Sequence, residues 1–135
     1  MGRFRVILLD THVVLWLAFE PTKISKKARV AIETARRNGE GLAISDITLL
    51  EITNLERKRR ISLRSTLETF LTEIEARFCV FPITARVCVR AANLPAIYPK
   101  DPADRVIGAT AMVEGILLVT ADNGIRRSKA LSTIW

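Results

Sequence analysis

Short runs of consecutive hydrophobic residues alternate along the chain with longer segments in which hydrophobic residues recur every three or four positions. Five such runs occupy residues 5–9, 41–44, 79–83, 116–120 and 131–135. Continuous rather than alternating hydrophobicity is typical of strands that are covered on both faces, as in parallel sheets. The pattern therefore predicts five short strands, most of them parallel.

The segments between these runs have the periodicity and the capping residues of helices. Helices are expected at residues 13–19, 26–37, 45–59, 65–77, 84–93 and 101–115, with a turn or short helix after Asp122. Ser25, Ser65 and Asp101 are N-cap candidates, and Asn38-Gly39 has the form of a left-handed C-cap. Alternating strands and helices predict an α/β fold, a three-layer α/β/α domain around a five-stranded, mainly parallel central sheet. Residues 1–135 are interpreted as one such domain.

Acidic residues occur where this architecture gathers functional groups. Asp10 and Asp122 follow two of the hydrophobic runs, so they are expected at the carboxyl ends of neighbouring parallel strands. Asp104 lies in the first turn of a helix that begins at the same edge of the sheet. Glu51 lies on the apolar face of its helix, where a carboxylate must be paired, protonated or bound to a cation. These acids are therefore expected to converge.

Carboxylates that gather without histidine or cysteine favour a hard divalent cation such as Mg²⁺ or Mn²⁺. Such an ion activates water and neutralises charge on a phosphate, which suits phosphodiester hydrolysis. Each acid also has a structural interpretation. Asp10, Asp101 and Asp122 can cap helices, Asp104 can interact with a helix dipole, and Glu51 can pair with an arginine. Only their coincidence at one edge favours the metal site.

The composition is that of a basic globular protein. Hydrophobic residues make up 49% and charged residues 26%, and 21 Lys and Arg against 14 Asp and Glu give a net charge of +7. The values exclude a disordered chain, and the charge favours a polyanionic partner such as nucleic acid. Cys79 and Cys88 lie in apolar stretches without metal-ligand spacing and are predicted to be buried and reduced. Apolar runs are too short for a signal peptide or membrane span, so a cytoplasmic location without membrane association is expected.

Other polar residues are weaker candidates. Arg126, Arg127 and Lys129 follow Asp122 closely and are suited to contact a nucleic-acid backbone, whereas residues 57–60 form a basic helix end that is usually only solvated. Asn54 lies one helical turn after Glu51 and is a candidate to support it. His12, the single histidine, is expected to pack or hydrogen-bond locally, because metal-activated water needs no histidine.

Three segments resemble one known family. The segments LLDTHVVLWL, SDITLLEI and DPADRVIGATAMVEGILLVTAD occur in this order and resemble PIN-domain ribonucleases. The opening DTH with the following LWL, together with the terminal tryptophan, resembles VapC-type toxins of toxin–antitoxin pairs. The resemblance implies an Mg²⁺- or Mn²⁺-dependent endoribonuclease that cleaves RNA, forms a homodimer and is held inactive by an antitoxin protein.

The resemblance also assigns roles to individual residues. It places the four acids of the family at Asp10, Glu51, Asp104 and Asp122. The small hydroxyl residue near the metal corresponds to Thr11, and Thr120 is a possible helper two residues before Asp122. Asp101 is assigned to helix capping, because it directly precedes Pro102.

Two alternatives remain open beside the toxin hypothesis. A housekeeping PIN-type RNA-processing nuclease would use the same acids for the same chemistry. A non-catalytic α/β module would bind only a cation or a protein partner, as receiver domains do. Receiver domains need a lysine near the acidic pocket late in the chain, where this sequence has Asp122, and this difference favours metal chemistry.

Overall fold

The computed structural model describes residues 6–39 and 41–135. Five short strands form one sheet in the order β3-β2-β1-β4-β5, and every hydrogen-bonded pair in it is parallel. The strands are β1 (Ile7–Leu9), β2 (Leu42–Ser45), β3 (Cys79–Phe81), β4 (Leu118–Val119) and β5 (Thr133–Ile134). The predicted five-stranded sheet is confirmed. Most strands are shorter than the hydrophobic runs, because only part of each run pairs with a neighbouring strand. Residue 5 of the first run lies outside the described residues.

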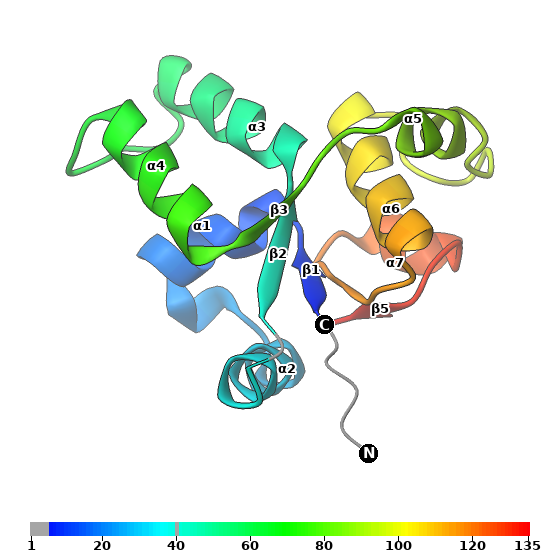
Figure 1. Cartoon of the computed structure of the whole chain (residues 1–135), viewed down its shortest axis with the longest axis horizontal. Coiled ribbons are helices and arrows are strands. Elements are labelled where there is room, and N and C mark those ends of the chain that lie inside the picture. The colour runs from blue at the N-terminus through cyan, green and yellow to red at the C-terminus, as the bar shows by residue number, and fades with distance from the viewer. Residues whose placement is uncertain (1–5, 40) are drawn as a thin grey trace.

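Helices connect the strands and cover both faces of the sheet. They are α1 (Thr11–Phe19), α2 (Lys26–Arg37), α3 (Asp46–Arg57), α4 (Leu67–Arg77), α5 (Ala85–Ala92), α6 (Pro102–Glu114) and α7 (Asn123–Ser128), with a 3₁₀ turn, η1 (Pro21–Lys23). Figure 1 shows α1 to α4 on one side of the strands and α5 to α7 on the other, which confirms the three-layer α/β/α class. None of these helices, within residues 6–39 and 41–135, combines the length and the hydrophobicity needed to cross a membrane.

Two hydrophobic clusters fill the space between the sheet and its two helical layers. Leu9 packs with α1, α2 and α4 through a cluster that includes Val13 and Ile32. Leu8 belongs to the opposite cluster, which includes Ile107 of α6 and Ile125 of α7. Successive strand residues point to opposite faces, so a strand buried on both faces must be hydrophobic at every position. This requirement explains the continuous runs in the sequence.

Several helix ends agree with the sequence. Ser25 accepts a hydrogen bond from the backbone N–H of Ala28 and caps α2, and Asp101 caps α6. Gly39 has a φ of +68°, in the left-handed region expected after α2. The hydroxyl of Ser45 accepts a hydrogen bond from the backbone N–H of Ile47 and caps α3.

Two other helix starts differ from the prediction. α1 begins at Thr11 rather than at residue 13, because Asp10 acts as its N-cap and accepts a hydrogen bond from the N–H of Thr11. α4 is capped by Thr66 rather than Ser65, because the Thr66 hydroxyl accepts a hydrogen bond from the backbone N–H of Thr69. Adjacent hydroxyl residues offer the same capping chemistry, and only the backbone conformation decides between them.

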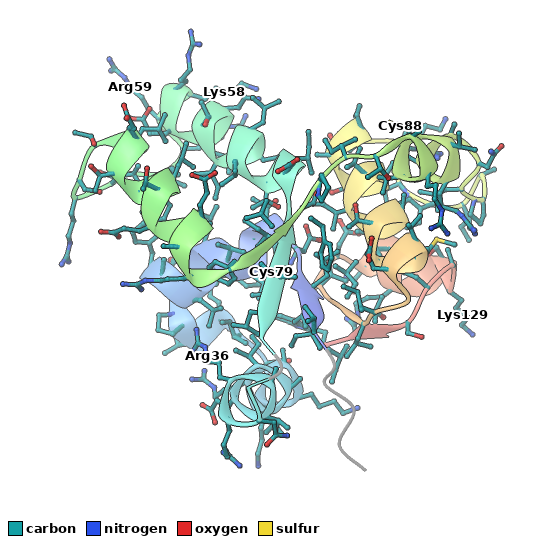
Figure 2. The ribbon with its side chains drawn as sticks, in the orientation of Figure 1. Arg36, Lys58, Arg59, Cys79, Cys88 and Lys129 are labelled. Atoms are coloured by element: carbon teal, nitrogen blue, oxygen red, sulfur yellow. The ribbon has the colours of Figure 1, made fainter. Side chains whose placement is uncertain are left out.

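The prediction that both cysteines are buried is wrong. Cys79 and Cys88 are free and exposed. Cys79 lies on β3, an edge strand of the sheet, and Cys88 lies on the outer side of α5 (Figure 2). Hydrophobic neighbours do not bury every residue of a surface element: Val87 is 1% exposed, whereas the adjacent Cys88 points outward.

Candidate active site

The carboxyl ends of β1 and β4 carry two of the predicted acids. Asp10 directly follows β1, and Asp122 follows β4 after two intervening residues. The two strands are parallel neighbours, and the backbone N–H of Asp10 donates a hydrogen bond to the carbonyl of Val119 at 3.0 Å. The predicted neighbouring position of these strands is confirmed.

Asp10 is buried, and its two carboxylate oxygens have different partners. The residue is only 3% exposed, and its Oδ1 accepts a hydrogen bond from the N–H of Thr11 at 2.8 Å. Oδ2 accepts one from the hydroxyl of Thr120 at 2.8 Å. The Thr120 hydroxyl in turn accepts the backbone N–H of Asp122 at 3.0 Å. Thr120 therefore links the two acids at the end of the sheet.

His12 is fixed by its neighbours. Its Nε2 accepts a hydrogen bond from the N–H of Ala121 at 2.9 Å, so that nitrogen carries no proton and the proton of the neutral ring is on Nδ1. Nδ1 lies 3.6 Å from Oδ2 of Asp10. The ring centroid lies 4.9 Å from that of Trp16 and 6.4 Å from that of Trp135. The expectation that His12 packs locally is confirmed by Trp16, whereas its hydrogen bond is to Ala121, which is 109 positions away in the sequence.

Glu51 reaches the same edge of the sheet from α3. Its Oε1 accepts a hydrogen bond from the hydroxyl of Thr11 at 2.5 Å, and that hydroxyl lies 3.0 Å from the hydroxyl of Thr48. Burial raises the pKa of Glu51, the hydrogen bond from Thr11 lowers it, and the charges of Asp10 and Asp101 raise it further; the net change is upward. Among the described residues Glu51 forms no ion pair with an arginine, so that alternative is excluded there.

Asp104 lies in the first turn of α6, and its pKa is raised to about 7. Burial is the largest cause, followed by the charges of Asp10, Asp101, Asp122 and Glu51. In water, one charged side chain changes the pKa of another only when the two lie within a short distance, because solvent and salt screen their interaction. The structure therefore brings the predicted acids into one electrostatic environment.

Several acids also have the capping roles considered from the sequence. Asp101 is exposed, and its Oδ2 accepts the N–H of Asp104 at 3.1 Å. Asp122 caps α7, because its Oδ1 accepts the N–H of Ile125 at 2.9 Å. The capping bond uses only Oδ1 of Asp122 and does not involve Oδ2. Capping of α7 therefore does not exclude a second function for this carboxylate.

The carboxylates are close enough to interact but are not arranged around a metal position. Within residues 6–39 and 41–135, no three His, Cys, Asp or Glu side chains form a group that could hold a metal ion. Burial and then repulsion between like charges raise the pKa of Asp104. The donor atoms are all carboxylate oxygens, which are the ligands that a hard divalent cation prefers. The predicted ligands Asp10, Glu51, Asp104 and Asp122 therefore match such a cation in the chemistry of their donor atoms, but their side chains are not gathered around one position.

The other predicted residues lie on the surface around this edge or farther away. Asn54 is exposed on α3. Arg126, Arg127 and Lys129, on or directly after α7, are exposed as well. Figure 2 shows Lys129 beside α7, on a different side of the molecule from Lys58 and Arg59 at the end of α3. The two basic segments therefore do not form one surface, and their roles stay predictions.

One buried residue close to the acids was missed by sequence reasoning. Tyr98 is 1% exposed, and its hydroxyl donates a hydrogen bond to the backbone carbonyl of Asp104 at 2.8 Å. Burial and the charges of Asp10, Asp104 and Asp122 raise its pKa, so the hydroxyl stays protonated. A glycine in the middle of a helix, Gly108, is the signal that could have indicated a large neighbour.

Comparison with known proteins identifies the class to which this fold and site belong. The sequence pattern of the PIN domain matches residues 7–131. The chain therefore belongs to the PIN-domain family. Within it, the chain is 37% identical over 131 residues to Ribonuclease VapC22 of Mycobacterium tuberculosis, covering 96% of this chain and 98% of that protein. The resemblance to VapC-type proteins inferred from the sequence is confirmed.

Solved structures share the fold at lower sequence identity. VapBC from Salmonella typhimurium bound to DNA superposes with a TM-score of 0.69 at 20% identity, covering 98% of both chains. VapBC-1 from nontypeable Haemophilus influenzae gives a TM-score of 0.68 at 17% identity, with 96% of both chains covered. FitAcB from Neisseria gonorrhoeae gives 0.57 at 22% identity, again over 96% of both chains. These similarities confirm the PIN fold.

Proposed function

We propose that this chain is a metal-dependent endoribonuclease and the toxin of a toxin–antitoxin pair. The observation that carries the proposal is the group of acids at one sheet edge, supplied by the end of β1, α3, α6 and the β4–α7 turn. Burial first, and then the charges of the neighbouring acids, raise the pKa of Asp104 to about 7. Among the described residues, no lysine or arginine forms an ion pair with these acids. The 37% identity to a VapC ribonuclease supports the same chemistry.

In this proposal Asp10, Glu51, Asp104 and Asp122 hold Mg²⁺ or Mn²⁺. When bound, the ion would activate water and neutralise charge on the phosphate of the RNA. Thr11 orients Glu51, and Thr120 orients Asp10, through their hydroxyl hydrogen bonds. Hydrolysis by water in line with the leaving oxygen would leave a 5′-phosphate and a 3′-hydroxyl.

The proposed partners follow from the same reasoning. The structural neighbours include VapBC and FitAB complexes, and one is a toxin-antitoxin complex from Klebsiella pneumoniae. We therefore propose an antitoxin protein as a partner of this chain, together with a homodimeric state and RNA as the substrate. The side chains of Arg126, Arg127 and Lys129 are proposed to contact the RNA backbone.

Cleavage of RNA by the purified chain tests the proposed activity. Mixed tRNA and rRNA are incubated with Mg²⁺, with Mn²⁺ or with EDTA, and we expect discrete fragments only when a divalent ion is present. Absence of cleavage by folded protein that demonstrably binds Mn²⁺ would favour a non-catalytic module. Growth arrest on expression, relieved by co-expression of an antitoxin, separates a toxin from a housekeeping nuclease.

Removing positive charge after Asp122 is expected to weaken RNA binding without affecting the acids. The double variant Arg126→Ala/Arg127→Ala should show a weaker salt dependence of RNA affinity, because the slope falls by about one for each phosphate that the protein no longer neutralises. Affinity is measured by fluorescence anisotropy between low and moderate salt in EDTA. The charge-matched control Lys26→Ala/Lys27→Ala changes exposed residues at the start of α2 and should leave the slope nearly unchanged. Equal slopes for both variants would refute the assignment.

A further inference from the structure

Two consecutive residues before α6 each occupy the space beside a glycine. They belong to the segment that joins α5 to α6 (Figure 1). The ring of Tyr98 lies against Gly108 in α6, where an added Cβ would be 2.1 Å from the Tyr98 hydroxyl oxygen. Pro99 lies against Gly124 in α7, where an added Cβ would be 3.0 Å from Cγ of Pro99. Each contact depends on the absence of a side chain at the glycine.

These contacts reach the turns that carry two of the acids. The Tyr98 hydroxyl donates to the backbone carbonyl of Asp104 at 2.8 Å. The Cβ position of Gly124 is 3.1 Å from Oδ1 of Asp122, the oxygen that caps α7. Adjacent residues of one segment therefore contact the first turn of α6 and the first turn of α7.

The first turns of α6 and α7 need such support because their acids repel one another. Asp104 and Asp122 are like charges, and without a cation each carboxylate is favoured to move apart toward solvent. Side-chain hydrogen bonds hold Asp10 and Glu51, but the contacts to the first turn of α6 are made through its backbone. Tyr98 itself is held in place, since its N–H donates to the carbonyl of Pro95 at 2.9 Å.

We propose that Tyr98 and Pro99, here called the Tyr98-Pro99 wedge, position Asp104 and Asp122 relative to one another. Tyr98 fixes the first turn of α6 by its hydroxyl and its ring, and Pro99 fixes the first turn of α7 through Gly124. Both are positioning residues, because they act through the acids and not on substrate. The inference rests on the proposed function only in the experiment that measures binding of a divalent ion.

Tyr98→Phe tests the wedge with the smallest change, since it removes the hydroxyl and keeps the ring. We expect the Kd for Mn²⁺, measured by calorimetry on the full chain, to rise roughly two- to tenfold, the range for loss of one hydrogen bond. The Tm in EDTA is measured beside the Kd, because the carbonyl of Asp104 loses its hydrogen-bond donor in this variant. Gly124→Ala is the second variant and should weaken Mn²⁺ binding, because the added Cβ would press on Pro99 and on Oδ1 of Asp122. The control Ile32→Val alters the opposite core cluster and should leave the Kd unchanged.

Amide hydrogen exchange in EDTA provides a readout that needs no metal. In Tyr98→Phe, exchange at the N–H of Asp104 should become faster, because the hydroxyl supports the first turn of α6, and in Gly124→Ala exchange at the N–H of Ile125 should become faster, because Pro99 supports the first turn of α7. In Ile32→Val these two rates should match the wild type. If the wild type binds no Mn²⁺, the metal proposal fails, and the exchange rates alone decide about the wedge. Unchanged exchange at both amides in Tyr98→Phe and Gly124→Ala, or a lower Tm with an unchanged Kd, would overturn it.

Discussion

Asp104→Asn is expected to reduce metal-dependent RNA cleavage at least about a hundredfold, the scale for loss of a metal ligand rather than of its support. The variant removes the negative charge and keeps the size of the side chain. The contacts that place this residue are made by its backbone, which donates to Asp101 and accepts from Tyr98, so the fold should persist. Initial rates on a labelled RNA in saturating Mn²⁺, beside a far-UV circular dichroism spectrum, check the prediction.

Asp101→Asn is the matched control for this experiment. Asp101 is exposed and three residues away, and asparagine caps helices about as well as aspartate. Its cleavage rate should stay close to that of the wild type, although Asp101 also contributes to the raised pKa of Asp104. Equal loss of activity in both variants would show that Asp101, and not Asp104 alone, is required. Full activity of Asp104→Asn would refute the proposed metal ligands.

Sequence reasoning located the sheet and two of its acids because both follow from local rules. A continuous hydrophobic run ends at Asp10 and another just before Asp122, and parallel strands present their carboxyl ends at one edge. The position of Asp101 before Pro102 likewise predicted its capping role, which the hydrogen bond from Asp104 confirms. Glu51 could be identified because a carboxylate on an apolar helix face requires an explanation.

Features that depend on contacts between distant segments could not be predicted in the same way. The link from Thr120 to Asp10 joins residues 110 positions apart, and the contact of Tyr98 with Gly108 is visible only when the segment before α6 is folded back on that helix. The exposure of Cys79 depends on β3 being an edge strand, which the hydrophobicity of its run does not indicate. The arrangement of the segments in space decides all three features.

The titration of Asp104 is expected to make the metal-free protein less stable at pH 8 than at pH 5. In the fold the pKa of Asp104 is raised from its ordinary value of 3.8 to about 7, mainly by burial and then by Asp10 and other acids. Between these values the folded chain binds a proton that the unfolded chain has released. The free energy of unfolding therefore falls as the pH rises through this window and does not recover above it. The raised pKa of Glu51 acts in the same direction.

Asp104→Asn should weaken this dependence, because asparagine does not titrate. In EDTA at pH 8 its Tm should exceed that of the wild type, whereas exposed Glu33→Gln, on α2, should behave like the wild type. Saturating Mn²⁺ should reverse the order, since a cation that binds only the folded state stabilises the wild type more than the variant. Thermal unfolding at pH 5 and pH 8, with EDTA or Mn²⁺, measures both effects. An Asp104→Asn protein that is less stable than the wild type in EDTA at pH 8 would mean that the acids are not held together against their repulsion, and the electrostatic basis of the proposed site would fail with it.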